Sequence, residues 1–200
     1  MIGKQTSLIG AALILSLVMF TVPAWAGDCG EVITIDSIEY PVPDRWCGKK
    51  LDSTQIADPE MLVCLAEELT YEDYRIYVRP EVKAAFSRMA AVAKKDSIDL
   101  IIDSGYRSAS FQERIIIQRL EAGKSVQEIL TMVAPPGYSE HETGRAVDLV
   151  PSEALFASSR TYRWLKENAS HFGFRESYPE SAADSISWEP WHWYYSPATE

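Results

Sequence analysis

The chain has 200 residues, and its 29 acidic residues outnumber its 19 basic ones, which gives a formal net charge of −10 at pH 7. An acidic chain without a basic patch repels phosphate, so nucleic acid is excluded as a partner. Hydrophobic residues make up 46% of the chain. This composition and length suit one domain with a sizeable core.

The first 26 residues have the pattern of a signal peptide. Lys4 precedes the apolar run LIGAALILSLVMF, and the small-residue sequence AWA ends at Ala26, where we expect cleavage. The apolar run is short for a membrane span, so we expect no stable membrane insertion after cleavage. Retention of the segment as an N-terminal anchor is the alternative. In either case we expect residues 27–200 to be exported, to the periplasm, the cell wall or the extracellular space.

Three cysteines, Cys29, Cys47 and Cys64, lie in the first third of the chain. Export permits a disulfide, and an odd number leaves one thiol over. We favour a bond between Cys29 and Cys47, which flank a turn-rich stretch. Cys64 falls in a segment with the pattern of an amphipathic helix and is expected in the core. No cysteine pair has zinc-binding spacing, so a zinc site built from cysteines is not expected.

The pattern along the chain begins with an irregular, proline-containing stretch up to residue 58. Periodic apolar positions then predict helices over residues 58–69, 79–96, 110–123, 125–134 and 159–174. Short β-branched or aromatic runs predict strands within residues 97–108, 144–151 and 189–197. Because helices and strands do not alternate strictly, we expect an α+β fold with a small, mostly antiparallel sheet and helices packed on it.

An aspartate, Asp148, stands inside the apolar run AVDLV of an expected buried strand. A buried carboxylate without a partner is costly or loses its charge, so Asp148 needs a partner. His141 lies seven residues earlier, and a turn at Gly144 can fold its imidazole back beside the carboxylate. His192 is the other histidine in a strand-like, aromatic setting. His171 ends a predicted helix and is interpreted as a residue that interacts with the helix dipole.

Two imidazoles and one carboxylate are ordinary zinc ligands, and a catalytic zinc keeps one position open for water. The remaining positive charge would lower the pKa of that water toward neutrality. Glu189, three residues before His192, could take the proton and pass it to a leaving amine if the chain bends at Pro190. Arg107, just after a strand end, could hold a carbonyl oxygen or a substrate carboxylate, or could simply pair with Asp103.

Other interpretations of these residues remain open. A lone histidine or aspartate on a strand is commonly a hydrogen-bonded structural residue. The tryptophans at positions 188, 191 and 193 have the pattern of core and pocket wall, and an exposed sugar-binding platform is the minority interpretation. A purely structural zinc would need a fourth protein ligand, from His171 or a cysteine. A disulfide-bonded exported interaction domain would hold no metal.

Four segments in order, SGYRSASFQ, SEHETGRAVDL, WLKENASHFGFRESYP and EPWHWYY, resemble the zinc D-alanyl-D-alanine carboxypeptidases of the VanY type. That group includes the D-Ala-D-Ala dipeptidases and the zinc domain of hedgehog signalling proteins. Its pattern is S-x-H-x(6)-D followed by E-x-x-H, and the resemblance covers roughly residues 80–196. The proline of EPWH is more similar to the carboxypeptidases than to the dipeptidases. The chain departs from the family at Tyr194 and Tyr195, where a basic residue is common.

The resemblance implies roles for particular residues. The zinc ligands would be His141, Asp148 and His192. Glu189 would act as general base and acid, and Arg107 would steady the scissile carbonyl. The substrate site would be lined by Arg107, Gln112, Ser139 and Trp191.

The resemblance also implies a fold similar to hedgehog and the D-Ala-D-Ala peptidases, with Zn²⁺ as cofactor. We divide the chain into a signal peptide (1–26), an N-terminal extension of unknown role (27–75) and a zinc peptidase domain (76–200). The implied enzyme, expected to be monomeric, removes the C-terminal D-alanine from peptidoglycan stem peptides. An L,D-carboxypeptidase, a D,D-dipeptidase or a wall endopeptidase would carry the same residues.

Overall fold

The computed structural model describes residues 29–181 and 187–197, so the expected signal peptide lies outside the described residues. Helices are combined with small antiparallel sheets, which confirms the α+β class. Within the described ranges no helix is both long enough and apolar enough to cross a membrane.

A four-stranded antiparallel sheet with the order β5-β6-β8-β7 lies at the centre of the molecule. Its strands are β5 (Ile102–Ser104), β6 (Ala146–Leu149), β7 (Phe174–Glu176) and β8 (His192–Tyr195). β6 is buried along its whole length, because it lies between two other strands. The register pairs Asp148 of β6 with His192 of β8 and with Ser104 of β5. Directly opposite residues point to the same face, so the sheet brings these side chains together.

Helices α1 (Pro80–Lys95) and α4 (Arg160–Asn168) pack with this sheet around the main core. The predicted apolar stripe of α1 is fully buried, and its Phe86 meets Phe174 of β7 edge to face, with the ring centroids 5.9 Å apart. α4 is shorter than predicted, because a 3-10 turn over Ala169–Phe172 follows it and ends at Gly173 in the left-handed conformation.

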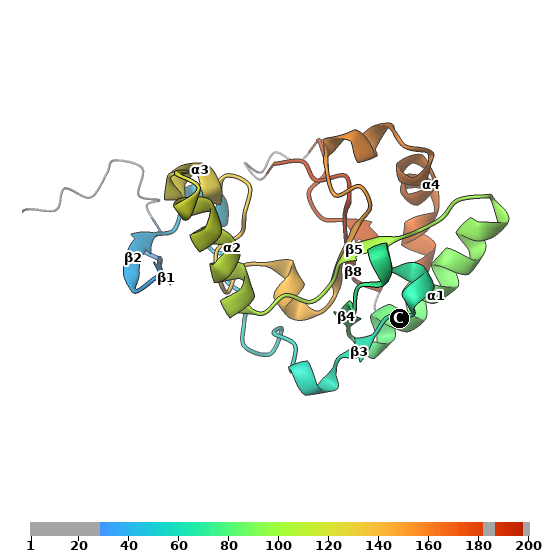
Figure 1. Cartoon of the computed structure of the whole chain (residues 1–200), viewed down its shortest axis with the longest axis horizontal. Coiled ribbons are helices and arrows are strands. Elements are labelled where there is room, and N and C mark those ends of the chain that lie inside the picture. The colour runs from blue at the N-terminus through green and yellow to red at the C-terminus, as the bar shows by residue number, and fades with distance from the viewer. Residues whose placement is uncertain (1–28, 182–186, 198–200) are drawn as a thin grey trace, which may run out of the picture.

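A second core lies at the opposite end of the molecule's long axis (Figure 1). There α2 (Ala109–Glu121) and α3 (Val126–Leu130) pack against a hairpin of β1 (Val32–Ile35) and β2 (Ile38–Pro41). Its buried residues are Ile33, Ile35, Val42, Trp46, Ile116, Val126, Ile129, Leu130, Val133 and Tyr138. The N-terminal extension is therefore packed against helices that the sequence assigns to the main domain.

The segment 58–69 does not form the amphipathic helix that its pattern predicts. Two short 3-10 turns form instead, over Pro59–Met61 and Glu67–Leu69, and Asp58 caps the first by accepting a hydrogen bond from the Glu60 N–H. Between the two turns lies β3 (Val63–Cys64), which pairs with β4 (Tyr77–Val78). Pairing with β4 overrides the local helical preference of this segment. Cys64 is thus a partly buried strand residue.

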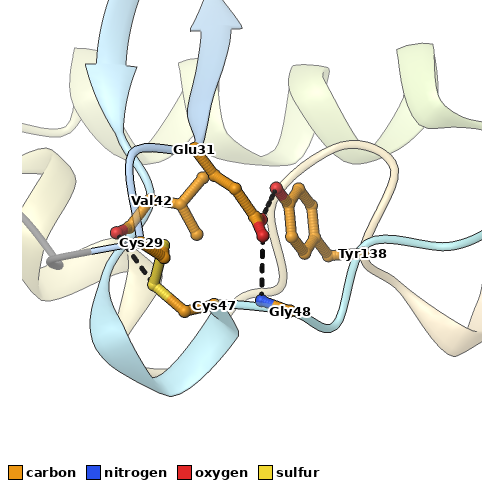
Figure 2. Close-up of a disulfide and its surroundings, with 6 residues drawn as sticks. All are labelled: Cys29, Glu31, Val42, Cys47, Gly48 and Tyr138. Carbon is orange, nitrogen blue, oxygen red and sulfur yellow. Dashed lines mark hydrogen bonds between the residues drawn. A yellow bond between two sulfur atoms is a disulfide. The ribbon is translucent and has the colours of Figure 1, made fainter.

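Cys29 and Cys47 form a disulfide, as favoured from their positions, and Cys64 is a free thiol. Figure 2 shows Glu31 beside this bond, with its carboxylate directed toward Tyr138 and Gly48. The carboxylate accepts hydrogen bonds from the Tyr138 hydroxyl at 2.6 Å and from the Gly48 N–H at 3.0 Å. The disulfide-linked segment is therefore joined to the loop that precedes His141.

Further hydrogen bonds join the N-terminal extension to α3 and to the loop that precedes His141. The indole N–H of Trp46 donates to the Leu130 carbonyl at 2.9 Å. Backbone N–H groups of Leu51 and Ala57 donate to the carbonyls of Gly137 and Glu142, at 2.8 and 2.9 Å. The extension thus satisfies backbone groups of the loop that leads into the sheet.

Removing the disulfide with the double substitution Cys29→Ser and Cys47→Ser is expected to lower the free energy of unfolding by about 2–4 kcal/mol. The bond links residues separated by 18 positions, and losing it increases the entropy of the unfolded chain. Urea unfolding followed by circular dichroism measures the change. Cys64→Ser is the matched control, with an expected change of about 0.5 kcal/mol or less. A loss below about 1 kcal/mol for the double variant would contradict the expectation.

Candidate metal centre

Three buried side chains, His141, Asp148 and His192, offer ligand atoms that all lie within 4.8 Å of one another. His141 belongs to a 3-10 turn (Glu140–Thr143) that leads through Gly144 into β6. Gly144 has a φ of 66°, a left-handed conformation that reverses the chain at low cost only for glycine. Asp148 and His192 are opposite each other on neighbouring strands. The fold thus gathers the three residues that the sequence singled out.

The tautomer of His141 follows from its hydrogen bonds. Its Nδ1–H donates to the Gly105 carbonyl, 2.6 Å away, and a carbonyl can only accept. Burial, aided by the charge of Arg107, lowers the pKa of His141 to about 4, so the ring is neutral and Nε2 carries a lone pair. Nε2 lies 3.1 Å from Oδ2 of Asp148 and has no hydrogen-bond partner among the described residues. Two electron-rich atoms therefore face each other, an arrangement that a cation stabilises.

His192 faces carboxylates with both ring nitrogens. Nδ1 lies 2.9 Å from Oδ1 of Asp148, and Nε2 lies 3.0 Å from Oε2 of Glu140. Burial opposes a charge on this ring, but hydrogen bonds to the two carboxylates and their negative charges raise the pKa of His192 to about 10. A proton or a metal ion on Nδ1 would satisfy Asp148 equally well.

Asp148 remains ionised in spite of its position. Burial alone would raise the pKa of this carboxyl, but the hydrogen bond from His192 and the positive charge of that ring hold it well below its usual range. Arg107 approaches from a third side, with Nη2 3.4 Å from Oδ2. Among the described residues Arg107 forms no ion pair with Asp103, whose carboxylate accepts a hydrogen bond from the Ser152 hydroxyl. Arg107 Nε is buried and has no partner in the described part of the chain.

Glu189 lies at a turn that begins before β8. The His192 N–H donates to the Glu189 carbonyl at 3.0 Å, so the chain bends across Pro190 as expected. Burial raises the pKa of Glu189 to about 7, with the positive charge of His192 opposing and Asp148 reinforcing the shift. This carboxyl can therefore either hold or release a proton near neutral pH.

The remaining predicted residues are buried or half-buried. Gln112 of α2 is buried and donates from Nε2 to the Ala134 carbonyl at 2.9 Å, while its Oε1 has no partner among the described residues. Ser139 is buried at the start of the turn that carries His141. Trp191 is half-buried and packs against the main core. Ser139 thus begins the turn of His141, Gln112 is bonded to the segment that precedes this turn, and Trp191 contacts the main core.

Two residues that sequence reasoning did not select also contact the cluster. Glu140 is hydrogen-bonded to His192, and Tyr178 stacks on the same imidazole with the ring centroids 5.0 Å apart and 28° between the planes. The available signal for Glu140 was an acidic residue directly before a candidate ligand. Tyr178 had no such signal, because its contact depends on how the chain folds back after β7.

The donor set fits a zinc ion. Zinc–nitrogen and zinc–oxygen bonds of about 2.0–2.1 Å in a tetrahedral site place ligand atoms about 3.3 Å apart. The distances of 3.1 Å from His141 Nε2 to Oδ2 of Asp148 and 2.9 Å from His192 Nδ1 to Oδ1 end on different carboxylate oxygens, and they place both imidazoles within reach of an ion bound by this carboxylate. Two imidazoles and one carboxylate also match the ligand types of catalytic zinc sites.

Comparisons with known proteins agree on one family. A protein-family model described as VanY, D-alanyl-D-alanine carboxypeptidase, matches residues 75–198. A D-alanyl-D-alanine carboxypeptidase of Enterococcus faecium is 32% identical over 166 residues, which cover 82% of this chain and 50% of that protein. The chain spans about half the length of the curated relatives it matches.

Solved structures show the same fold. The structure of the LdcB LD-carboxypeptidase, described as revealing the molecular basis of peptidoglycan recognition, matches with a TM-score of 0.66 and 27% identity, over 86% of this chain and 88% of that one. A mutant of the vancomycin-resistance D,D-pentapeptidase VanY in complex with Zn(II) matches with a TM-score of 0.56 and 26% identity, over 73% of this chain and 82% of that one.

Proposed function

The chain belongs to the VanY family of D-alanyl-D-alanine carboxypeptidases, and on this premise we propose that it is a zinc peptidase that removes the C-terminal D-alanine from peptidoglycan stem peptides. The observation that carries the proposal is the buried cluster of His141, Asp148 and His192, with ligand atoms within 4.8 Å of one another. The similar fold of a zinc-bound D,D-pentapeptidase supports the choice of metal.

In the proposed site, Nε2 of His141, a carboxylate oxygen of Asp148 and Nδ1 of His192 would hold the zinc. The unpartnered lone pair of His141 beside an ionised carboxylate supports this assignment. When bound, the metal would supply a Lewis acid that polarises the peptide carbonyl and activates water. Gly105, through its carbonyl, keeps the His141 lone pair directed toward Asp148.

Glu189 is proposed as the group that moves the proton. Its pKa, raised to about 7 by burial, makes the carboxylate a competent base at neutral pH and the protonated form a competent acid. The same residue can therefore take a proton from the attacking water and deliver it to the departing amino group of D-alanine. Its turn position next to His192 supports this role.

Arg107 is proposed to bind the substrate oxygen atoms. One guanidinium nitrogen lies 3.4 Å from Asp148, whereas Nε has no partner among the described residues. A guanidinium has five N–H groups in a fixed plane, so the remaining donors suit a scissile carbonyl or a terminal carboxylate. Gln112, Ser139 and Trp191 are proposed to line the same substrate site.

We also propose that residues 76–200 form the peptidase unit, which residues 27–75 stabilise, and that the protein is exported with loss of residues 1–26. Hydrogen bonds from Leu51 and Ala57 to the loop that carries His141 support the stabilising role. The Cys29–Cys47 disulfide supports export, because disulfides persist mainly in oxidising compartments.

A second candidate function is L,D-carboxypeptidase activity on the same stem peptides. The TM-score of 0.66 to the LdcB LD-carboxypeptidase, over 86% of this chain, favours it. The two activities differ in the residue that precedes the terminal D-alanine, which is a D-centre in pentapeptides and an L-centre in tetrapeptides. The catalytic cluster would be the same for both.

Purified muropeptides distinguish these candidates. With the zinc-loaded protein, we expect pentapeptide muropeptides to lose one alanine, as measured by mass spectrometry, and a chelator to stop the loss until zinc is added back. Loss of one alanine from tetrapeptides would assign the L,D-activity, and release of a dipeptide would assign a dipeptidase. Unchanged masses for every substrate, with zinc bound, would refute the proposed peptidase activity.

A further inference from the structure

Glu140 contacts the ring nitrogen of His192 that does not face Asp148. Its Oε2 lies 3.0 Å from Nε2 of His192, while Nδ1 of the same ring lies 2.9 Å from Asp148. The side chain of Glu140 is only 20% exposed, and that of His192 is 3% exposed. Glu140 is thus an acidic side chain placed behind one proposed metal ligand, largely shielded from water.

We propose that Glu140 is a positioning residue that fixes the tautomer and the orientation of His192 for metal binding. With zinc on the Asp148 side, as proposed, the proton of the neutral His192 ring lies on Nε2, where the Glu140 carboxylate accepts it. The lone pair is then on Nδ1, the atom that faces Asp148. A carboxylate bonded to the far nitrogen also makes an imidazole a stronger ligand. This inference rests on the proposed zinc site and extends it beyond the three ligands.

Neighbouring side chains fix both Glu140 and the plane of the imidazole. The second carboxylate oxygen, Oε1, lies 3.5 Å from Nη2 of Arg175, whose guanidinium lies over the Tyr194 ring, 4.9 Å from its centroid. Tyr178 stacks against one face of His192. The ring is therefore held by an edge contact at Nε2 and a face contact, which together leave it little freedom to rotate.

A purely structural ion pair between Glu140 and Arg175 explains these contacts less well. The Arg175 side chain is 51% exposed and its contact to Glu140 is the longer one, at 3.5 Å. The contact from Glu140 to His192 is shorter, at 3.0 Å. Exposed ion pairs contribute little, so the contact of consequence for Glu140 is the one to the imidazole.

The test compares zinc affinity and the His192 ring nitrogens in wild-type protein and in Glu140→Ala and Glu140→Gln. Competition with a chromophoric chelator measures the affinity, and ¹⁵N NMR of the zinc-loaded protein reports which His192 nitrogen carries a proton. Glu140→Ala should weaken zinc binding by about 10–100-fold and speed exchange of the Nε2 proton. Glu140→Gln keeps an amide oxygen that can accept the hydrogen bond. Its zinc affinity should fall less than that of Glu140→Ala, but by at least about threefold.

Glu81→Gln is the matched control. Glu81 lies on α1, and its ion-pair partner is Arg145, at 3.2 Å, and not one of the three proposed ligands. The zinc affinity of Glu81→Gln should stay within about twofold of wild type. Unchanged zinc affinity and unchanged exchange of the Nε2 proton in Glu140→Ala would overturn the inference. If Glu140→Ala does not fold, unchanged zinc affinity in Glu140→Gln would overturn it. A wild-type spectrum with the proton on Nδ1 and the metal on Nε2 would also overturn it. Failure of wild-type protein to bind zinc would instead refute the proposed metal site.

Discussion

Replacing Glu189 with glutamine is expected to lower kcat on pentapeptide muropeptides by about 10²–10⁴-fold, with the zinc content unchanged. Glutamine has nearly the same volume as glutamate but cannot accept a proton from water or return one to the leaving amine. The buried site, which raises the pKa of Glu189 to about 7, gives the carboxylate this function. The rate of D-alanine release measures the loss, and elemental analysis of the purified protein measures zinc.

The control for this substitution is Glu167→Gln, the same chemical change on the exposed surface of α4. It should leave both kcat and zinc content at wild-type values. Activity of Glu189→Gln within a few-fold of wild type would remove Glu189 from the mechanism. Loss of zinc from Glu189→Gln would show that the residue acts on the metal site and not on the proton.

Replacing Asp148 with asparagine is expected to abolish both zinc binding and activity. Asp148 faces His141 at 3.1 Å, His192 at 2.9 Å and Arg107 at 3.4 Å, so its charge compensates the whole cluster. A neutral amide leaves the Arg107 charge without its partner and contributes no anionic ligand. Zinc at a thousandfold excess over Kd should stabilise the wild-type protein by about 4 kcal/mol, whereas the variant should show no rise in Tm.

Asp103→Asn provides the matched control, because Asp103 lies on neighbouring β5 and bonds to Ser152 instead of the cluster. Its zinc content and the zinc-dependent rise in Tm should equal those of the wild type. An Asp148→Asn protein that retains one equivalent of zinc after dialysis would contradict the proposed ligand set.

The candidate site was predictable from the sequence because a carboxylate in an apolar run needs a partner. That reasoning led from Asp148 to His141 and His192, and the structure places their ligand atoms together. The contact of Glu140 with His192 was not predictable, because no sequence pattern gives the direction of the Glu140 side chain. Only the three-dimensional path of the chain decides which ring nitrogen an acidic neighbour reaches.

The helices were predictable where their periodic signal was long. The 16-residue helix α1 shows several turns of apolar periodicity and begins with proline. The strands β5, β6 and β8 are equally short but lie in apolar or aromatic runs, whereas β1, β2 and β7 are partly exposed and gave no such signal. The segment 58–69 failed for a different reason, since its β3 residues pair with a strand that follows after a long connection.

The pairing of Asp148 with His192 across β6 and β8 makes the geometry of the cluster independent of the length of the chain between them. Insertions or deletions in the loops between β6 and β8 need not separate the two side chains, whereas α4, β7 and Tyr178 pack against the core or the His192 ring. A single residue inserted within β8 would have the opposite consequence, because it would turn His192 to the other face of the sheet. Variation in substrate preference can therefore arise in the connecting segments while the strands keep the ligand atoms in place.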